Sequence, residues 1–115
     1  MSKALAGLIA LIALCANAHA APQTCTGKIL RYLTYYEGSV VIYPDWRNDW
    51  LFICNLNTPW KGVSVASCAA WLSTVKAAVS LPTHPSTTTT YADAPGCSSV
   101  PTYNSAPAPD SITSP

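Results

Sequence analysis

The stretch KILRYLTYYEGSVVIY, residues 28–43, decides the fold that we expect for this chain. Two runs rich in β-branched and aromatic residues, 28–36 and 39–43, flank the dipeptide Glu37-Gly38. Such runs favour β-strands, and glycine readily adopts the positive φ that tight turns need. The stretch therefore predicts a β-hairpin.

A third strand and a helix are predicted downstream of the hairpin. Pro44 ends the second run, residues 45–49 form a polar turn, and residues 50–56 (WLFICNL) give a third strand that completes an antiparallel meander. Ser64 suits a helix N-cap, and apolar residues then recur at helical spacing until the prolines at 82 and 85. The recurring residues are Val65, Cys68, Leu72, Val75 and Val79.

The remaining segments give weaker signals. Residues 21–24 predict a short exposed lead-in, and residues 97–103 predict at most one short strand. Residues 87–91 (TTTTY) fit either a fourth strand or a threonine-rich linker, and the sequence leaves both open. Residues 104–115 are rich in Pro, Ala and Ser and predict a disordered tail.

The order of three strands, a helix and one or two further strands indicates an α+β domain over residues 21–103. We expect a small antiparallel sheet crossed by one helix. A five-stranded barrel of the oligonucleotide/oligosaccharide-binding (OB) type is one fold that fits this order. A domain of this size has a marginal core, so it needs stabilisation from another source.

Residues 1–20 have the three parts of a secretory signal peptide. Lys3 supplies a positive charge, residues 4–15 form an apolar run, and residues 18–20 (AHA) match the small-x-small cleavage pattern. The apolar run is shorter than the roughly 20 residues of a membrane-spanning helix, so an uncleaved anchor is the weaker alternative. Cys15 does not fit a lipoprotein site, because the bulky Leu14 precedes it. We expect cleavage after Ala20, a secreted or periplasmic protein, and no membrane span after cleavage.

Four cysteines follow the predicted signal: Cys25, Cys54, Cys68 and Cys97. An even number of cysteines in a small exported chain indicates disulfides. Their long, irregular spacing, without a histidine pair, argues against zinc, so we expect no metal site. Three pairings are possible. We favour Cys54–Cys68, which would tie the third strand to the helix, and Cys25–Cys97, which would close the domain.

The charge composition narrows the classes of partner. Only 10% of the residues are charged, against about 25% in a typical domain, and the formal net charge is +1. Because there is no basic run or stripe, we expect neither nucleic acid nor anionic membrane as a partner. No motif calls for a cofactor, so we expect none.

No group of residues in the sequence points to catalysis. His84 lies in a short loop between two prolines, where a histidine is usually solvated. No G-x-S-x-G, H-E-x-x-H or P-loop motif occurs. The acidic residues all fall in predicted turns or in the tail: Glu37, Asp45, Asp49, Asp93 and Asp110. We therefore expect a protein that is not an enzyme.

The best candidate for a ligand-binding segment is the turn before the third strand. Two indoles flank planar polar groups there, and sugars bind where aromatic rings stack on their C–H faces while polar groups take their hydroxyls. Protein partners also favour Trp and Arg. In the alternative interpretation both indoles pack against the core edge. Trp60 and Lys61 either join this surface or lie elsewhere, and Trp71 belongs to the core. The candidate residues are Trp46, Arg47, Asn48, Asp49 and Trp50.

Several local strings carry a resemblance to known proteins. They are CTGKI at 25–29, DW at 49–50, ICN at 53–55, GVS at 62–64, CA at 68–69, WL at 71–72, Cys97, PTY at 101–103 and APAP at 106–109. Together they resemble a group of small exported proteins of Gram-negative bacteria, which implies export but no particular activity. More distantly, a strand with a cysteine followed by a helix with another is similar to the OB-type B subunits of bacterial AB5 toxins. That similarity implies glycan binding and leaves the oligomeric state open.

We expect a small secreted or periplasmic domain without catalysis, which binds a partner or has a structural role in the envelope. The partner stays open, with a glycan and an envelope protein as candidates. The alternatives are a glycan-binding module of the B-subunit kind and a small enzyme inhibitor.

Overall fold

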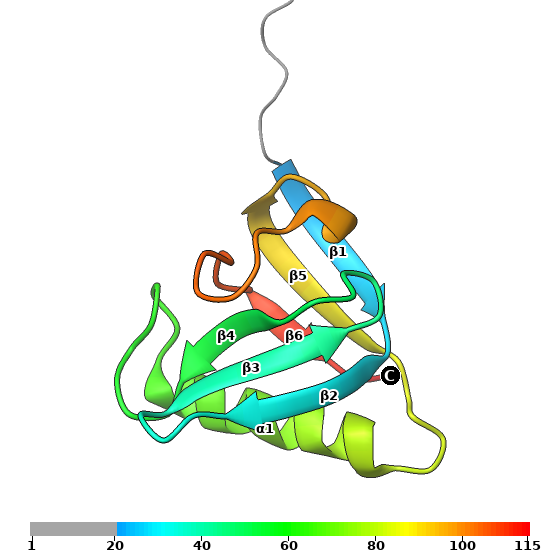
Figure 1. The fold of residues 1–115 in the computed structure, drawn as a ribbon, viewed down its shortest axis with the longest axis horizontal. Helices are drawn as coiled ribbons and strands as arrows, with labels where there is room; N and C mark the ends of the chain where they lie inside the picture. Colours follow the sequence, from blue (N-terminus) through cyan, green and yellow to red (C-terminus); the bar gives the residue numbers. More distant parts are fainter. Residues whose placement is uncertain (1–20) are drawn as a thin grey trace, which may run out of the picture.

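A computed structural model describes residues 21–115 of the chain, and the predicted signal peptide lies outside these described residues. The described part contains one α-helix and six strands in two groups (Figure 1). In chain order the elements are β1 (Ala21–Gly27), β2 (Ile29–Thr34), β3 (Ser39–Pro44), β4 (Leu51–Asn55), α1 (Val65–Ser80), β5 (Thr87–Ala94), the 3-10 helix η2 (Cys97–Ser99) and β6 (Ser111–Thr113).

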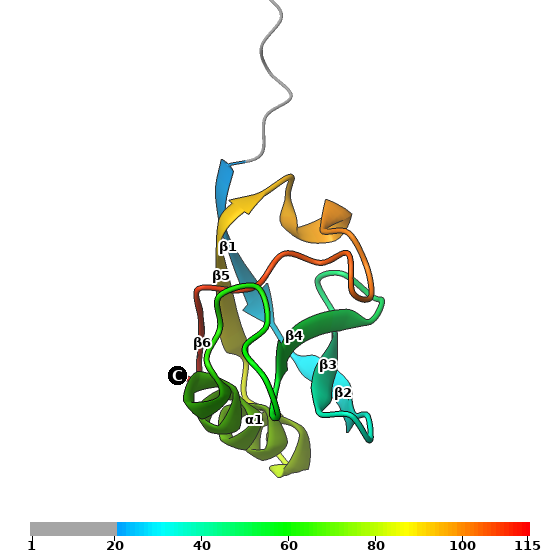
Figure 2. The ribbon, with the colours of Figure 1, turned by 90° about the vertical axis from the view of Figure 1, so that its left-hand side faces the viewer.

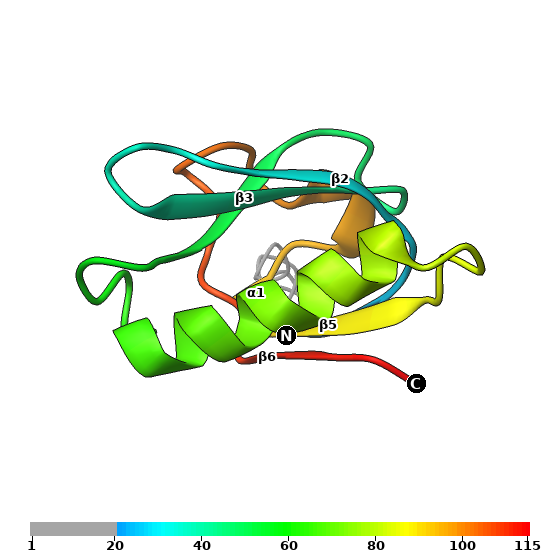
Figure 3. The same cartoon turned by 90° about the horizontal axis from the view of Figure 1, so that it is seen from below.

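The strands form two three-stranded antiparallel sheets, one in the order β2-β3-β4 and the other in the order β1-β5-β6. Only Lys28 separates β1 from β2, so one extended run passes from the second sheet into the first. Seen from below, α1 runs across the gap between β2–β3 and β5–β6 (Figure 3). The predicted α+β class is confirmed, with two sheets in place of the expected single one.

The predicted meander is present as β2, β3 and β4. Thr34 pairs with Val40 next to the turn, where Gly38 has a φ of +105°. A register shift in the β2–β3 ladder lies between Ile29 and Arg31. This irregularity lets Ile29 turn into the core, where its side chain is 1% exposed, although strict alternation would place it on the same face as Arg31.

Helix α1 begins where the sequence predicts. The Ser64 hydroxyl accepts a hydrogen bond from the backbone N–H of Ser67 at 3.1 Å, which satisfies one of the free amides of the first turn. At the other end the backbone N–H of Leu81 donates to the carbonyl of Ala77, and Pro82 then prevents a further turn.

The threonine-rich stretch is strand β5, which decides between the two alternatives that the sequence left open. It pairs with β1 on one side and β6 on the other, so that Thr24, Thr90 and Ser111 lie in one cross-strand row. Residues 21–24 are therefore the first half of β1 and not a lead-in. Hydroxyl pairs on the outer side, such as Thr26–Thr88 at 3.0 Å, link the strands of this sheet.

The C-terminal segment also differs from the prediction. Residues 97–103 contain the short helix η2 and only an isolated bridge from Tyr103 to Leu51. Residues 104–115, for which the composition predicts a disordered tail, end in β6, where Ile112 is buried with 5% exposure. Backbone pairing with β5 compensates for the small apolar surface of this segment, so the packed domain extends past residue 103.

The core fills the space between the two sheets and α1 (Figure 2). The inner side of β2–β3–β4 supplies Val40, Ile42, Leu51 and Ile53, and these residues cluster with Val75 and Cys68 of α1 and with Cys25, Tyr91 and Ile112 of the other sheet. The first sheet is therefore covered by α1 on its inner side only.

Both favoured disulfide pairings are present. Cys54–Cys68 joins β4 to α1 with a Cα–Cα distance of 5.5 Å, and Cys25–Cys97 joins β1 to η2 with a Cα–Cα distance of 5.6 Å. Two disulfides indicate an oxidising, extracytoplasmic environment. Across residues 21–115, no helix has the length and apolar character needed to cross a membrane.

Candidate ligand-binding face

The predicted segment 46–50 does not form one site, because its residues separate in the structure. The Trp46 ring packs edge-on against Tyr91 with centroids 6.3 Å apart, and its Nε1 is buried. The Arg47 Nε donates to the carbonyl of Val100 at 2.7 Å. Asn48 has a φ of 59° in the turn, and Asp49 Oδ1 accepts from the backbone N–H of Trp50 at 2.7 Å. Packing and turn formation thus account for the first four residues.

Trp50 belongs to a different cluster, built with residues of β2 and β3. Its ring lies edge-on to Tyr43, with centroids 5.2 Å apart and an interplanar angle of 75°. Arg31 is the cross-strand partner of Tyr43, and its Cζ lies 4.6 Å from the centroid of the Tyr43 ring and 5.5 Å from that of Trp50. Arg31, Tyr43 and Trp50 therefore form a cation–π cluster.

The same side of the sheet carries a second aromatic group. Tyr35 stacks on Phe52, with ring centroids 5.8 Å apart. Trp60, in the loop after β4, has its ring centroid 6.4 Å from that of Phe52. Phe52 lies in a cross-strand row with Leu33 and Val41, next to the row of Arg31 and Tyr43, so the two groups adjoin. We name this surface the aromatic face and define it by Arg31, Leu33, Tyr35, Tyr43, Trp50, Phe52 and Trp60.

The alternation of side chains along a strand explains the position of the aromatic face. Arg31, Leu33 and Tyr35 are two residues apart, so they point to the same side of the sheet, opposite to the side chains that the meander contributes to the core cluster. Helix α1 packs against that opposite side. On the aromatic face, Arg31 is exposed, the Tyr35 side chain is 43% exposed and the other rings are half-buried. Exposed apolar surface of this kind is typical of interaction sites.

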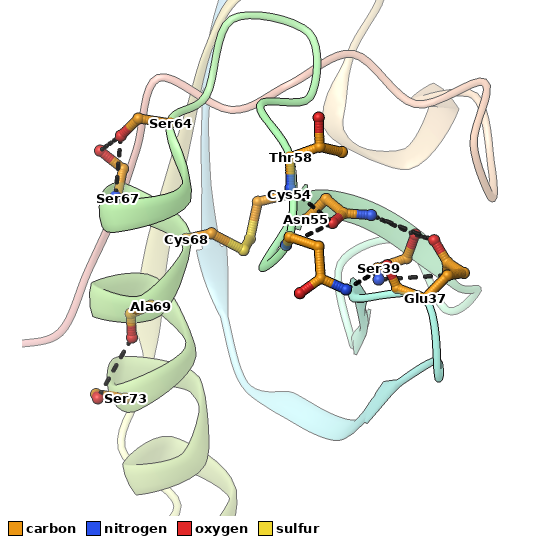
Figure 4. The surroundings of a disulfide bond; sticks show 11 residues. Glu37, Ser39, Cys54, Asn55, Thr58, Ser64, Ser67, Cys68, Ala69 and Ser73 are labelled. Atoms are coloured by element: carbon orange, nitrogen blue, oxygen red, sulfur yellow. Dashed lines mark hydrogen bonds between the residues drawn. A yellow bond between two sulfur atoms is a disulfide. The ribbon is translucent and has the colours of Figure 1, made fainter.

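A polar network beside the Cys54–Cys68 disulfide fixes the far end of the aromatic face (Figure 4). The Glu37 carboxylate accepts from the Ser39 hydroxyl at 2.9 Å and from Asn55 Nδ2 at 3.2 Å. Asn55 Oδ1 in turn accepts from the backbone N–H groups of Asn57 and Thr58. These bonds tie the β2–β3 turn to the exit of β4, and so they hold the loop that carries Trp60.

A shallow cavity of about 280 Å³ lies at the start of α1. The Trp71 ring, which is half-buried and packs against the core as expected, forms part of its lining. Lys61 also lines it, but the Lys61 Nζ donates to the carbonyls of Asn104 and Ala106 at 2.9 and 2.7 Å. The Lys61 ammonium therefore holds the C-terminal segment in place, and its position also brings it 4.7 Å from the Trp60 ring centroid.

The titratable residues are dispersed. His84 is exposed in the turn after α1, with a φ of 45°. Burial raises the pKa of the Tyr91 phenol, which lies in the core and away from solvent. Within residues 21–115 no group of three or more His, Cys, Asp or Glu side chains is placed to hold a metal ion.

Sequence reasoning predicted Trp50 as a ligand contact and left open whether Trp60 joins it, but it missed Arg31, Leu33 and the other residues of the aromatic face. The signal was present, since Arg31, Leu33 and Tyr35 fall on one side of the predicted hairpin. Both sides of these strands are apolar, however, so the hydrophobic pattern does not say which side faces the core.

Comparisons with known proteins give no relative on which to test this surface. No protein-family model, no curated protein and no solved structure matches the chain.

Proposed function

We propose that this protein is an exported binding module and that the aromatic face is its binding surface. The observation that carries the proposal is the clustering of Tyr43, Trp50, Tyr35 and Phe52 on the side of the sheet that α1 leaves uncovered. Burial of such rings is favourable by about 25 cal/mol per Å² of apolar area, so their exposure forgoes stability that a bound partner would recover. Interfaces are also enriched in Tyr, Trp and Arg.

Export through residues 1–20 is part of the proposal. The first described residue, Ala21, is also the first residue of β1, so cleavage after Ala20 would leave every described strand intact. The two disulfides fit a protein that acts outside the cytoplasm. Mass spectrometry of the protein recovered from the periplasm or the medium should give a chain that starts at Ala21. A chain that retains residues 1–20 there would contradict export by cleavage.

Binding fits the aromatic face better than catalysis does. Acid–base catalysis needs cooperating groups whose protonation changes near neutral pH. The seven residues of the aromatic face contribute one guanidinium and the phenol hydroxyls of Tyr35 and Tyr43, and they include no carboxylate, imidazole or thiol. These groups can stack, donate and attract, and they are suited to holding a ligand.

Among the candidate partners, a glycan is favoured by the way the rings are arranged. Tyr43 and Phe52 lie in neighbouring cross-strand rows of one sheet, and each contacts a second ring, Trp50 and Tyr35 respectively. Consecutive rings suit consecutive sugar units of a chain, since each ring offers an apolar surface to the C–H face of a sugar. Arg31 adds planar polar donors next to one of the two groups.

A panel of soluble polysaccharides in affinity electrophoresis tests this function. The exported form of the protein should be retarded by at least one of them, and Trp50→Ala and Tyr35→Ala should each weaken the retardation by about tenfold, as loss of 1–2 kcal/mol of stacking implies. Thr24→Ala is the control, because Thr24 is exposed on the outer side of the other sheet. Retardation that is equal in all three variants would refute binding through the aromatic face.

A further inference from the structure

We infer that the ligand of the aromatic face carries carboxylate groups and that Arg31 binds one of them, which makes a polysaccharide with uronic-acid units the class of ligand. The inference rests on the proposed glycan-binding function and adds the chemistry that would select among glycans. It is carried by the contacts of Arg31 and by the positions of the acidic side chains.

Arg31 is exposed at the corner that two perpendicular rings form. Its Cζ is 4.6 Å from the Tyr43 centroid and 5.5 Å from the Trp50 centroid. Contact with an aromatic ring uses the flat side of a guanidinium, while its five N–H donors point outward in the guanidinium plane. Because the two rings are inclined by 75° to each other, the guanidinium can lie flat on only one of them, and the donors that face neither ring remain for a ligand.

The acidic residues nearest in the chain do not pair with Arg31. Glu37 accepts hydrogen bonds from Ser39 and Asn55 at the hairpin turn, and Asp49 accepts from the backbone of Trp50. The Asp45 carboxylate lies beside Gly27, where β1 meets β2. In the described part of the chain no carboxylate forms an ion pair with Arg31, so the charge on this part of the aromatic face is uncompensated.

An uncompensated cation restricts the ligand that can cover it. A neutral sugar stacked on Trp50 and Tyr43 would remove water from the Arg31 guanidinium without supplying a counter-charge, and burial of an unpaired charge is costly. A carboxylate supplies the charge and can accept two parallel N–H bonds from the guanidinium fork. This planar pairing also fits beside a flat ring. A uronic acid combines such a carboxylate with a sugar ring that can stack.

The test compares two forms of one polymer, polygalacturonate and its methyl ester, which differ in the charge of the carboxyl groups. The exported protein should bind polygalacturonate about tenfold or more tightly than the ester, in keeping with one charge-assisted hydrogen-bonded pair. Arg31→Lys keeps the charge but loses the fork, so most of this preference should disappear, and Arg31→Gln should abolish it. Arg31 is exposed and contacts only the surface rings of Tyr43 and Trp50, so these variants should stay folded, with at most a small decrease in the thermal unfolding midpoint.

Lys76→Gln is the matched control, since it removes one positive charge from the exposed side of α1 and should leave the preference unchanged. Equal binding of polygalacturonate and its ester, or no binding of polygalacturonate, would overturn the inference, and so would a preference retained in Arg31→Gln. Equally tight binding of dextran sulfate would also overturn it, because general electrostatic attraction would then suffice. Binding of neutral glycans that still depends on Trp50 would leave the proposed function standing, whereas binding of no glycan, or binding unaffected by Trp50→Ala, would count against both.

Discussion

At the scale of single residues, the contact between Trp46 and Tyr91 is the least satisfied part of the core. Trp46 Nε1 and the Tyr91 hydroxyl are both buried without a hydrogen-bond partner among residues 21–115. Their rings meet edge-on at 6.3 Å. The packing of the two rings therefore stabilises the fold here. The two unpartnered polar atoms destabilise it, because a buried unsatisfied polar group costs about 1–3 kcal/mol.

Tyr91→Phe should therefore stabilise the protein, since it removes an unpartnered hydroxyl and keeps the ring. We expect the free energy of unfolding to rise by about 1 kcal/mol in urea titrations. Tyr36→Phe, at a side chain that is 98% exposed, is the control and should change nothing. Destabilisation by Tyr91→Phe would show that the hydroxyl has a partner in the native state.

The raised pKa of Tyr91 predicts that the protein loses stability at alkaline pH. Burial raises the pKa of Tyr91 in the folded protein above the ordinary value, about 10, that it regains on unfolding. Above that pH the unfolded chain releases the Tyr91 proton, whereas the folded chain keeps it. The free energy of unfolding is therefore unaffected by this phenol below about pH 10 and decreases as the pH rises further. Between pH 9 and 11, Tyr91→Phe should lose less stability than the parent protein. Parallel pH curves for the two proteins would argue against this.

At the scale of elements, the β2–β3 hairpin depends on the glycine of its turn. Gly38 has a φ of +105°, and a Cβ there would lie 2.6 Å from Asn55 Oδ1 and 2.8 Å from Asn57 Nδ2. A side chain at this position would thus be strained and would also disturb the Glu37–Asn55 network. The hairpin turn and the loop after β4 are coupled through this one position.

Gly38→Ala should destabilise the protein by about 2 kcal/mol or more, through backbone strain together with the close contact. Gly62→Ala is a matched control, because Gly62 also has a positive φ, +87°, but has open space around its Cβ position. We expect about 1 kcal/mol there, from strain alone. Thermal or urea unfolding measures both, and equal costs would mean that the network near Asn55 adds nothing.

Strand β6 shows what local sequence does not reveal. Its three residues, Ser111-Ile112-Thr113, have too little hydrophobic pattern to predict a strand, and β1 contains Pro22 and Gly27, which disfavour one. Both strands exist because β5 lies between them and satisfies their backbone groups. Such pairing joins residues of β1 and β5 that are 60 or more positions apart, so it cannot be predicted from neighbouring residues.

Ile112→Ala tests whether β6 is part of the core. Ile112 is 5% exposed, and truncation of a buried isoleucine costs about 2–5 kcal/mol, so the variant should unfold at a clearly lower urea concentration. Ser114→Ala, one position past the strand at an exposed residue, should be neutral. If Ile112→Ala were neutral as well, the disordered tail predicted from composition would be the better description.

At the scale of the whole molecule, the sequence is sufficient for the elements with strong local signals. The hairpin, the third strand and the capped helix follow from turn residues and periodicity, whereas the sequence leaves three cysteine pairings possible and only favours the one that is present. The arrangement into two sheets depends on long-range pairing and does not follow from local sequence. The candidate site is only partly predictable, because the sequence does not show that Trp46 enters the core while Trp50 lies on the aromatic face.

The division of the first sheet into two sides connects the fold to the proposed function. Its inner side packs against α1 and the second sheet, and its outer side presents rings and one cation to solvent. The outer side of the second sheet instead carries paired hydroxyls such as Thr90–Ser111 at 2.6 Å. One small domain thus has two outer faces of different chemistry, and the aromatic face is the one suited to ligands that stack.

Backbone amide chemical-shift mapping by NMR tests most directly whether the aromatic face is the binding surface. The protein without residues 1–20 would be titrated with an oligogalacturonate and, in parallel, with a neutral cello-oligosaccharide. We predict that the perturbed amides fall in β2, β3 and β4 and near Trp60, together with shifts of the Trp50 indole N–H. Perturbations confined to β1, β5 and β6, or the absence of perturbation by both sugars, would contradict a glycan-binding role for the aromatic face.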